Sequence, residues 1–438
     1  MSNNDSKGNA FSGLIGFLMT AIGFAVGIGS IWRFPYMLGT NGGSLFLFVY
    51  VGIILLIGVP LYVAETTMGF KTQKTAVLAY RELAPSPKQR FWSYGGYLHL
   101  LAALIIISYS IPIYAWILGY LFNTIKGTFV GMDAQGLNDF FNSFSTNMPQ
   151  LIIFAILNLV ICGVIVSGGV QKGVEMLTKV LLPILGVVMV ILIVAGIRME
   201  GSSKGFAFLF QPDASAFTIA SLKEVLGQAF FALGIGMLAA EVFGSYIKNP
   251  KENIGKSATI ISIALVSAGV MAGMMIFPAL FAADFEATSS VGLVFLTVPL
   301  VFNSMPGGQI LGALFFFGFY IAAITSTVGV VEAIVGMFMD QFGMTRKKGL
   351  LITIAIMAVV GFLCLPAGAI FTFFDSIINY LLIAGVFIIS IFVGWIWGAD
   401  NFIEATNIQT LALRSWVKIA VKYLSPLVIV AFLVISFI

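Results

Sequence analysis

The sequence contains very little charge. Only 9% of its 438 residues are Asp, Glu, Lys or Arg, against roughly 25% in ordinary soluble domains. Hydrophobic residues make up 60% of the chain. A soluble globule, a collagen, a coiled coil and a disordered chain all need a different composition, so these classes are excluded. The composition predicts an all-α polytopic membrane protein, because its long apolar segments suit membrane-spanning helices.

Residues that carry metal or nucleophilic chemistry are also scarce. The two cysteines, Cys162 and Cys364, stand inside apolar runs, which is typical of buried thiols and not of disulfides or metal sites. The single histidine, His99, is too little for a multi-histidine metal site, and we expect a packed or interfacial imidazole. No phosphate loop or activated nucleophile is present, so we predict that the protein is not an enzyme.

Long apolar segments are abundant. A membrane-spanning helix needs about 20 mainly apolar residues, and eleven segments meet that test. They are residues 13–38, 44–69, 95–124, 150–167, 174–197, 222–246, 257–285, 307–339, 350–366, 370–397 and 418–438. The stretch 286–306 is apolar but interrupted by Pro299 and Pro306, so we expect an extracellular hairpin or re-entrant loop there.

The basic residues indicate an orientation. With a cytoplasmic N-terminus, all but five of the 22 Lys and Arg residues fall on the cytoplasmic side, where membrane proteins retain them. The odd number of spans then places the C-terminus outside. No basic run is interleaved with aromatic residues, so we expect the lipid bilayer as a partner and no nucleic acid.

An internal repeat is the strongest signal in the sequence. Gly27-Ile28-Gly29 lies in the middle of the first segment, and Gly234-Ile235-Gly236 lies in the middle of the sixth. A helix-interior glycine costs about 1 kcal/mol, so each pair predicts a helix break. Close helix packing is the alternative role for such glycines. Five spans separate the two breaks, which predicts a five-plus-five inverted-repeat transporter core.

The predicted organisation follows from that repeat. Residues 1–12 form a cytoplasmic N-terminal arm, residues 13–197 the first repeat (helices 1–5), and residues 222–397 the second repeat (helices 6–10). The segment 418–438 is one extra C-terminal helix.

The first segment resembles the signature of the neurotransmitter:sodium symporter family. The resemblance runs from Gly23 to Tyr36 and continues in Asn41-Gly42-Gly43. Further matching residues are Gly58-Val59-Pro60, Glu65, Gly227-Gln228-Ala229-Phe230-Phe231, Gly244-Ser245-Tyr246, Thr325-Ser326 and Glu332. The resemblance implies a leucine-transporter-like fold and sodium-driven uptake of a small organic solute by alternating access. An eleven-span member implies a bacterial inner membrane.

The resemblance also implies one sodium site between helices one and eight. Its ligands would be carbonyl and hydroxyl oxygens, which suit a hard cation, at Gly23, Val26, Ala322, Thr325 and Ser326. Back-bonding of Thr325 and Ser326 to their own helix is the alternative role of these hydroxyls.

A second family sodium site is poorly matched. Its side-chain ligands fall on Ser30, Ala232 and Leu265, so two of three oxygens are missing. The family tyrosine that binds a substrate carboxylate matches Ser110, and we expect Tyr109 to face elsewhere on the helix. We therefore hypothesise one sodium per substrate, and a substrate that lacks an α-carboxylate or binds it without a first sodium.

The resemblance places the substrate beside the two helix breaks. The wall is apolar and small, so a compact neutral or zwitterionic solute fits better than a sugar or nucleotide. Ordinary helix packing is the alternative for each Phe and Met. The expected lining residues are Phe24, Ala25, Gly27, Ile28, Gly29, Ile106, Ser110, Phe230, Phe231, Gly234, Met237, Ser326 and Val330.

Gate residues carry over from the same resemblance. On the outside, Arg33 would have Gln228 and Asp375 as partners. On the inside, Tyr246 and Asp340 match the cytoplasmic closure. The usual Arg of the N-terminal arm is replaced, and Lys7 would substitute for it with a point charge in place of a fork.

Two carboxylates, Glu65 and Glu241, fall inside predicted spans. Burying a charge in a membrane costs at least about 2.5 kcal/mol unless it is paired or protonated. Glu65 resembles a structural carboxylate of the family. Glu241 departs from the family, and it would hold a substrate ammonium, bind a coupling proton, or pair with Glu65 or a polar neighbour.

These observations favour a sodium-coupled symporter for an amino acid or an amino-acid-like solute, with sodium as its ion. The alternatives are a sodium- or proton-coupled amine transporter that uses Glu241, and a non-transporting sensor.

Overall fold

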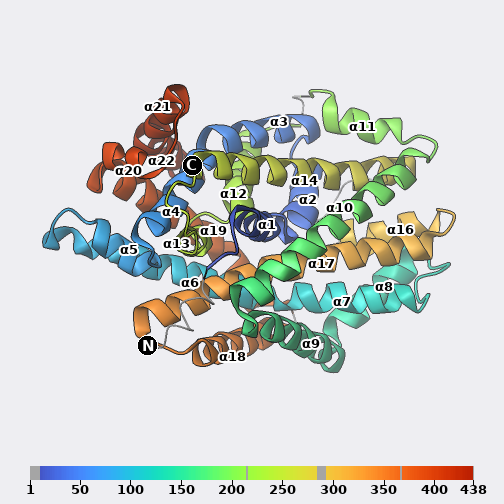
Figure 1. Ribbon diagram of the computed structural model, residues 1–438. Helices are drawn as coiled ribbons and strands as arrows, with labels where there is room; N and C mark the ends of the chain where they lie inside the picture. The colour runs from blue at the N-terminus through green and yellow to red at the C-terminus, as the bar shows by residue number, and fades with distance from the viewer. Residues whose placement is uncertain (1–9, 214–215, 284–292, 366, 438) are drawn as a thin grey trace.

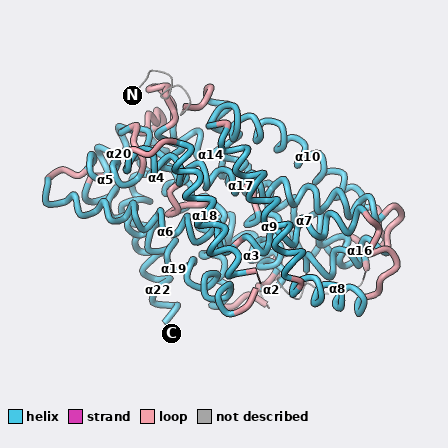
Figure 2. Tube along the Cα trace, turned by 90° about the horizontal axis from the view of Figure 1, so that it is seen from below, coloured by secondary structure: helices cyan, strands magenta, loops and turns pink. Residues whose placement is uncertain are grey.

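The computed structural model describes residues 10–213, 216–283, 293–365 and 367–437. These residues form helices joined by loops and contain no strand (Figure 2). Nine of the described helical segments are long and apolar enough to cross a membrane, or ten if one bent pair is counted as a span. The prediction of an all-α polytopic membrane protein is therefore confirmed.

The spans are built from long helices, some of them continuous with a second helix. They are α3 (Gly43–Ile53) with α4 (Val59–Thr72), α6 (Tyr94–Tyr109) with α7 (Ile111–Ile125), α9 (Met148–Ser167), α10 (Met176–Ile197), α14 (Ile254–Ala282), α17 (Gly308–Phe342), α18 (Arg346–Cys364), α19 (Ala369–Ile391), and α21 (Leu411–Ile419) with α22 (Ser425–Phe437). The last span begins at Leu411, earlier than the predicted residue 418.

Short helices connect or flank the spans. They are α5 (Ala76–Leu83), α8 (Ala134–Thr146), α11 (Ser203–Phe210), α16 (Val298–Asn303) and α20 (Ala399–Ala405). Figure 1 places α5 and α20 at one end of the molecule and α8, α11 and α16 at the other. In the predicted loop 286–306, residues 286–292 lie outside the described part of the chain.

The first G-I-G segment is a helix break. Helix α1 (Leu14–Ala25) ends at Val26, and a π-helical turn, Gly29–Arg33, leads into α2 (Phe34–Thr40). The two halves are bent by 46°. The glycines here allow close approach, because a Cβ added to Gly27 would lie 1.8 Å from the Ser326 hydroxyl oxygen.

The second G-I-G segment is a break of a different kind. Helix α12 (Ile219–Leu233) ends at Gly234, and α13 (Ala239–Ser245) begins after Leu238. Gly234 and Gly236 have φ values of 65° and 77°, which favour glycine. Leu238 also has a φ of 77°, a conformation that its side chain disfavours. The sixth predicted span therefore consists of two short helices. Neither is long enough to be counted among the nine described segments that could cross a membrane.

Helix ends follow local capping signals. Thr218 and Ser221 form a capping box at the start of α12, and the Asn253 side chain caps α14 by accepting from Lys256 N–H at 3.0 Å. Gly343, with φ of 63°, ends α17. The capping box fixes where α12, the helix that leads into the second break, begins.

Helix α17 lies at the centre of the bundle. Most of its 35 residues are buried, and it packs against α1, α7, α10 and α13 (Figure 1). Helices α4 and α13 touch backbone to backbone, because a Cβ on Gly69 would lie 1.7 Å from the Glu241 carbonyl oxygen and one on Gly244 would lie 2.1 Å from that of Thr66. The two helix breaks are thus held between α4, α6, α17 and α19.

Candidate functional site

A cavity of about 120 Å³ lies at the two helix breaks. Eleven of the predicted lining residues line it, namely Phe24, Ala25, Gly27, Ile28, Gly29, Ile106, Ser110, Phe231, Met237, Ser326 and Val330. Its wall combines apolar side chains with a few polar groups, an arrangement typical of small-molecule sites. The structure therefore brings most of the residues that the sequence predicts for the substrate site together around one cavity.

Two predicted residues do not line the cavity. Phe230 is 1% exposed and packs inside the bundle. Gly234 is covered by the Phe24 ring, because a Cβ on Gly234 would lie 2.2 Å from that ring. Gly234 therefore allows the chain to reverse direction and leaves space for the Phe24 ring, and it does not line the cavity.

Tyr109 corrects another expectation. We expected it to face away, yet it lines the cavity beside Ser110. Ser110, between α6 and α7, keeps helical dihedrals, and both neighbours, Tyr109 and Ser110, contribute to the same cavity wall. The Tyr109 hydroxyl hydrogen-bonds Asp375, another residue of that wall.

Two of the predicted sodium ligands, Thr325 and Ser326, lie next to each other on α17, and Ser326 lies beside the end of α1. The Ser326 hydroxyl donates to the carbonyl oxygen of Phe24 at 2.6 Å, and it fills the gap left by Gly27. The Thr325 hydroxyl donates to the carbonyls of Ile321 at 2.9 Å and Ala322 at 3.1 Å. Thr325 thus back-bonds to its own helix, whereas Ser326 reaches across to α1. In both groups the oxygen keeps lone pairs that a cation can use.

The family's other sodium position offers few oxygen ligands. The Ser30 hydroxyl is buried and donates to the carbonyl of Ala25 at 3.2 Å. Ala232 lines the cavity and Leu265 is fully buried, and neither side chain has an oxygen. The donor set at this position therefore fits a cation less well than the set around Ser326.

Arg33 lies in the cavity wall with Asp375 but does not form an ion pair with it in the described part of the chain. Its guanidinium donates to the Asn379 side-chain oxygen at 3.3 Å and lies 4.5 Å from the centre of the Phe231 ring. Asn379 is one helical turn beyond Asp375 on α19. The Gln228 side chain instead donates to the Gly29 carbonyl at 2.8 Å, which ties α12 to the first break.

Glu332, a residue of the family resemblance, is the centre of a buried ion pair. Arg346 donates both guanidinium nitrogens to the Glu332 carboxylate, at 2.6 and 2.8 Å, and Tyr246 donates its hydroxyl to Glu332 at 3.1 Å. Glu332 is 1% exposed. A bidentate pair of this kind is stronger and more directional than a single contact. This interaction joins α13, α17 and α18.

The N-terminal arm covers the same end. Phe11 N–H donates to the Tyr246 carbonyl at 3.2 Å, and the Phe11 ring packs 5.9 Å from the Tyr246 ring. Burial lowers the pKa of the Lys248 ammonium, which donates to Gln73 at 2.8 Å. Lys7 lies outside the described residues.

Asp340 lies near Tyr246 and binds the segment that leads into α5. Its carboxylate accepts from the Thr75 backbone N–H at 2.7 Å and from the Thr75 hydroxyl at 2.9 Å, at the start of α5. The described contacts join Tyr246 to Glu332 and not to Asp340. Asp340 therefore anchors α5 in this structure.

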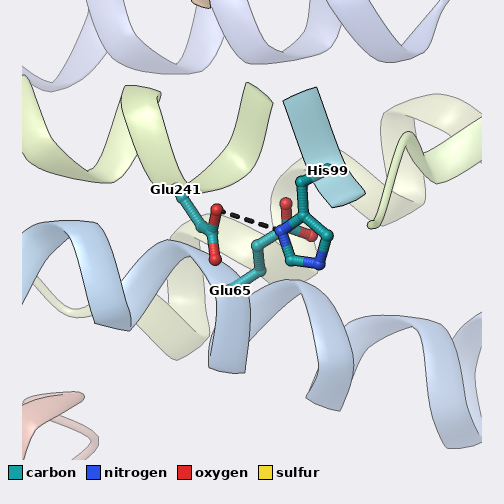
Figure 3. Close-up of side chains that lie close together, drawn as sticks. All are labelled: Glu65, His99 and Glu241. Carbon is teal, nitrogen blue, oxygen red and sulfur yellow. Dashed lines mark hydrogen bonds and ion pairs between the residues drawn. The ribbon is translucent and has the colours of Figure 1, made fainter. Parts of the chain in front are cut away.

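The two carboxylates inside the spans form a cluster with His99 (Figure 3). Glu65 from α4, His99 from α6 and Glu241 from α13 are all 0% exposed. His99 Nδ1 lies 3.2 Å from a Glu241 oxygen, and Glu65 accepts from Gly236 N–H at 3.0 Å. None of the three lines the cavity.

Known proteins resemble this chain over its length. A protein-family model described as the Sodium:neurotransmitter symporter family matches residues 8–133 and 141–438. The chain belongs to this family. It is 33% identical to the sodium-dependent transporter YhdH of Bacillus subtilis, over 89% of this chain and 88% of the relative.

Other family members agree. The mouse sodium- and chloride-dependent GABA transporter 2 is 24% identical, over 95% of this chain and 77% of the relative. A crystal structure of MhsT in complex with L-phenylalanine matches with a TM-score of 0.90 and 33% identity, over 98% of this chain and all of MhsT. The predicted leucine-transporter-like fold is confirmed. This family member is a sodium-coupled symporter of a small solute and not an enzyme.

Sequence reasoning missed three residues of this symporter's site. Tyr109 lines the cavity although only its neighbour Ser110 was predicted to do so. Arg346 could have been predicted as the partner of Glu332. Glu332 is a carboxylate in an apolar span, and Arg346 begins the next span. The pairing of His99 with Glu241 spans 142 residues and has no local signal.

Proposed function

We propose that this symporter imports an amino acid or amino-acid-like solute by alternating access, with one sodium bound at the α1 break against α17. The observation that carries the proposal is the contact of Ser326 with the Phe24 carbonyl, directly beside the cavity. A cation that accepts lone pairs from carbonyls and from Thr325 and Ser326 would hold the α1 break in place.

The order of events follows from which end is closed. The Glu332–Arg346 pair and the Phe11 packing close one end of the bundle, which the basic residues indicate as cytoplasmic. Arg33, at the other end, lacks an ionic partner across the cavity in the described contacts. Solute and sodium would enter past Arg33, and release would require the Glu332–Arg346 pair to separate. We also propose an N-terminus in the cytoplasm of a bacterial inner membrane.

The solute class rests on the wall of the cavity. Tyr109 brings a hydroxyl to the cavity wall, where it hydrogen-bonds the Asp375 carboxylate, and a solute carboxylate would have to take over this donor. L-Phenylalanine is the solute named in the MhsT structure, and it is the natural first probe. The remaining departures, Ala232 and Leu265, support one sodium per solute in place of two.

An amine substrate held by Glu241 is the weaker candidate. Glu241 is fully buried against His99 and lies outside the cavity wall, so an ammonium in the cavity would not reach it.

The proposal is tested by a thermal-shift screen of the purified protein. Amino acids, amines and osmolytes are each added in sodium and in choline buffer, with L-phenylalanine as the first probe. We expect stabilisation by an amino acid in sodium only. Stabilisation by amines alone would favour the second candidate, and the same shifts in choline as in sodium would contradict sodium coupling at this site. Uptake into vesicles would separate a transporter from a sensor.

A further inference from the structure

A buried acid cluster stands apart from the cavity and from the sodium ligands. One oxygen or nitrogen atom from each of Glu65, His99 and Glu241 lies within 4.8 Å of the other two, and each side chain is fully buried (Figure 3). Figure 3 shows the three side chains converging from three helices. Neither the cavity wall nor the inner closure uses them.

Hydrogen bonding fixes the proton count of the histidine. His99 Nε2 lies 3.4 Å from the Gly385 carbonyl oxygen, which only accepts, so Nε2 carries a hydrogen. Nδ1 lies 3.2 Å from Glu241 Oε2. Two bare lone pairs repel at this distance, so a proton lies between them. The His99–Glu241 pair therefore holds one proton more than a neutral imidazole beside an ionised carboxylate.

The surroundings offer no other positive charge. The charged groups acting on Glu65 are Glu241 and His99, and those acting on His99 are the two glutamates. The neighbouring titratable groups are Tyr62 from α4 and Tyr80 from α5. The second helix break adds the Gly236 N–H and α19 adds the Gly385 carbonyl, and no Lys or Arg of the described residues forms an ion pair with the cluster.

Two carboxylate oxygens of the cluster have no partner. Glu65 Oε1 and Glu241 Oε1 are both buried and make no hydrogen bond within the described part of the chain. A buried polar atom without a partner is unfavourable, and a second negative charge nearby adds repulsion. Binding a proton relieves both. The two unpartnered oxygens therefore leave the cluster room for a further proton.

The cluster also bridges two groups of helices. Glu65 and Glu241 belong to α4 and α13, whose backbones touch at Gly69 and Gly244 and so move together. His99 belongs to α6. Its Nε2–H donates to the Gly385 carbonyl of α19 and so links these two helices. Glu65 further accepts from Gly236 N–H inside the second break. Movement of α13 against α6 would open the His99–Glu241 contact and expose its proton.

We propose that Glu65, His99 and Glu241 form a proton-binding site whose proton is exchanged with water as α13 moves against α6. The proton leaves from between Nδ1 and Oε2 and returns when the contact closes. Proton occupancy of the cluster rests on its geometry alone. Its exchange during transport rests also on the proposed function.

The single histidine makes the site directly observable. The full chain is purified with a tag that contains no histidine, labelled with ¹⁵N-histidine, and followed by NMR from acidic to basic pH. We expect one imidazole signal set with Nε2 protonated and Nδ1 sharing a proton at neutral pH. A neutral imidazole with a bare Nδ1 throughout would overturn the proposal. So would a stoichiometric transition metal found in the same sample by elemental analysis.

Matched variants then test the exchange. In weakly buffered solution with a pH dye, addition of sodium to the wild type is expected to change the bound proton count. Glu241→Gln keeps the shape but is expected to lose this signal. Glu252→Gln alters another buried glutamate, which accepts from Ser257 at 3.0 Å, and is expected to keep it. A signal that survives in Glu241→Gln, or is lost equally in Glu252→Gln, would overturn the assignment.

The two proposals fail separately. Sodium-dependent stabilisation with a bare His99 Nδ1 at every pH would overturn the proton site and leave the symporter proposal standing. A titrating His99 that responds to Glu241→Gln, without any sodium-dependent effect of a solute, would support the proton site and contradict the proposed function.

Discussion

The Ser326 hydroxyl donates a 2.6 Å hydrogen bond to the carbonyl oxygen of Phe24, across the gap between α17 and the end of α1. This contact exists because Gly27 has no side chain to occupy the gap. It joins a broken helix to the longest helix of the bundle at the edge of the cavity. The account of sodium coupling depends on this contact.

The first prediction concerns the Ser326 oxygen. In Ser326→Ala, the sodium concentration for half-maximal stabilisation is expected to rise about tenfold, because one lost oxygen ligand is worth about 1.4 kcal/mol. Ser390→Ala is the control, since Ser390 is also buried and also bonds a carbonyl on another helix, that of Val421, at 2.8 Å. Equal sodium responses in the two variants would contradict the assignment.

Gly27 gives a second prediction. A Cβ at this position would lie 1.8 Å from Ser326 Oγ, so Gly27→Ala should push α1 from α17 and destabilise the protein by about 1–3 kcal/mol. The melting temperature should fall and the sodium response should be lost. Gly186→Ala in α10 meets nothing within 4 Å and should leave both unchanged. A normal sodium response in Gly27→Ala would show that close approach is not required.

Arg346 gives a third prediction. Arg346→Lys keeps the charge but loses the bidentate hydrogen bonding to Glu332. The end of the bundle that this pair closes should therefore open more readily. Amide hydrogen exchange in α13 and at the start of α1 should accelerate. Lys418→Gln breaks an exposed pair with Asp400 and should change nothing, because exposed pairs contribute at most about 1 kcal/mol. Unchanged exchange in Arg346→Lys would indicate that the Phe11 packing closes this end by itself.

Tyr109 gives a fourth prediction. Tyr109→Phe removes only the hydroxyl, so affinity for a carboxylate-bearing solute should fall about tenfold, with the response to sodium alone preserved. Tyr320→Phe is the control, because Tyr320 bonds Asn158 away from the cavity. Solute titrations in saturating sodium measure both. An unaltered solute affinity in Tyr109→Phe would show that another group donates to the solute carboxylate.

The sequence predicts the parts of this site that depend on local pattern. Both G-I-G breaks are present, and Thr325-Ser326 lies beside the first of them. Local pattern does not reveal why each glycine is needed. Gly234 and Gly236 reverse the chain with positive φ, whereas Gly27 makes room for another helix. Only the packed structure separates these two causes.

Partners across helices are the part that the sequence could not supply. The His99–Glu241 contact joins residues far apart in the chain, and a single sequence holds no signal for it. Arg33 was matched to Asp375, yet its hydrogen bond goes one turn further, to Asn379, since its guanidinium also stacks on Phe231. Side-chain packing decides such choices, and packing depends on all the neighbouring helices at once.

Sodium-driven accumulation tests the central claim most directly. Purified protein in liposomes is given a radiolabelled amino-acid mixture under an inward sodium gradient or an equal choline gradient. The account predicts accumulation above equilibrium with sodium only, abolished by a sodium ionophore, and reduced in Ser326→Ala but not in Ser390→Ala. Equal uptake under both gradients, or full accumulation in Ser326→Ala, would contradict it.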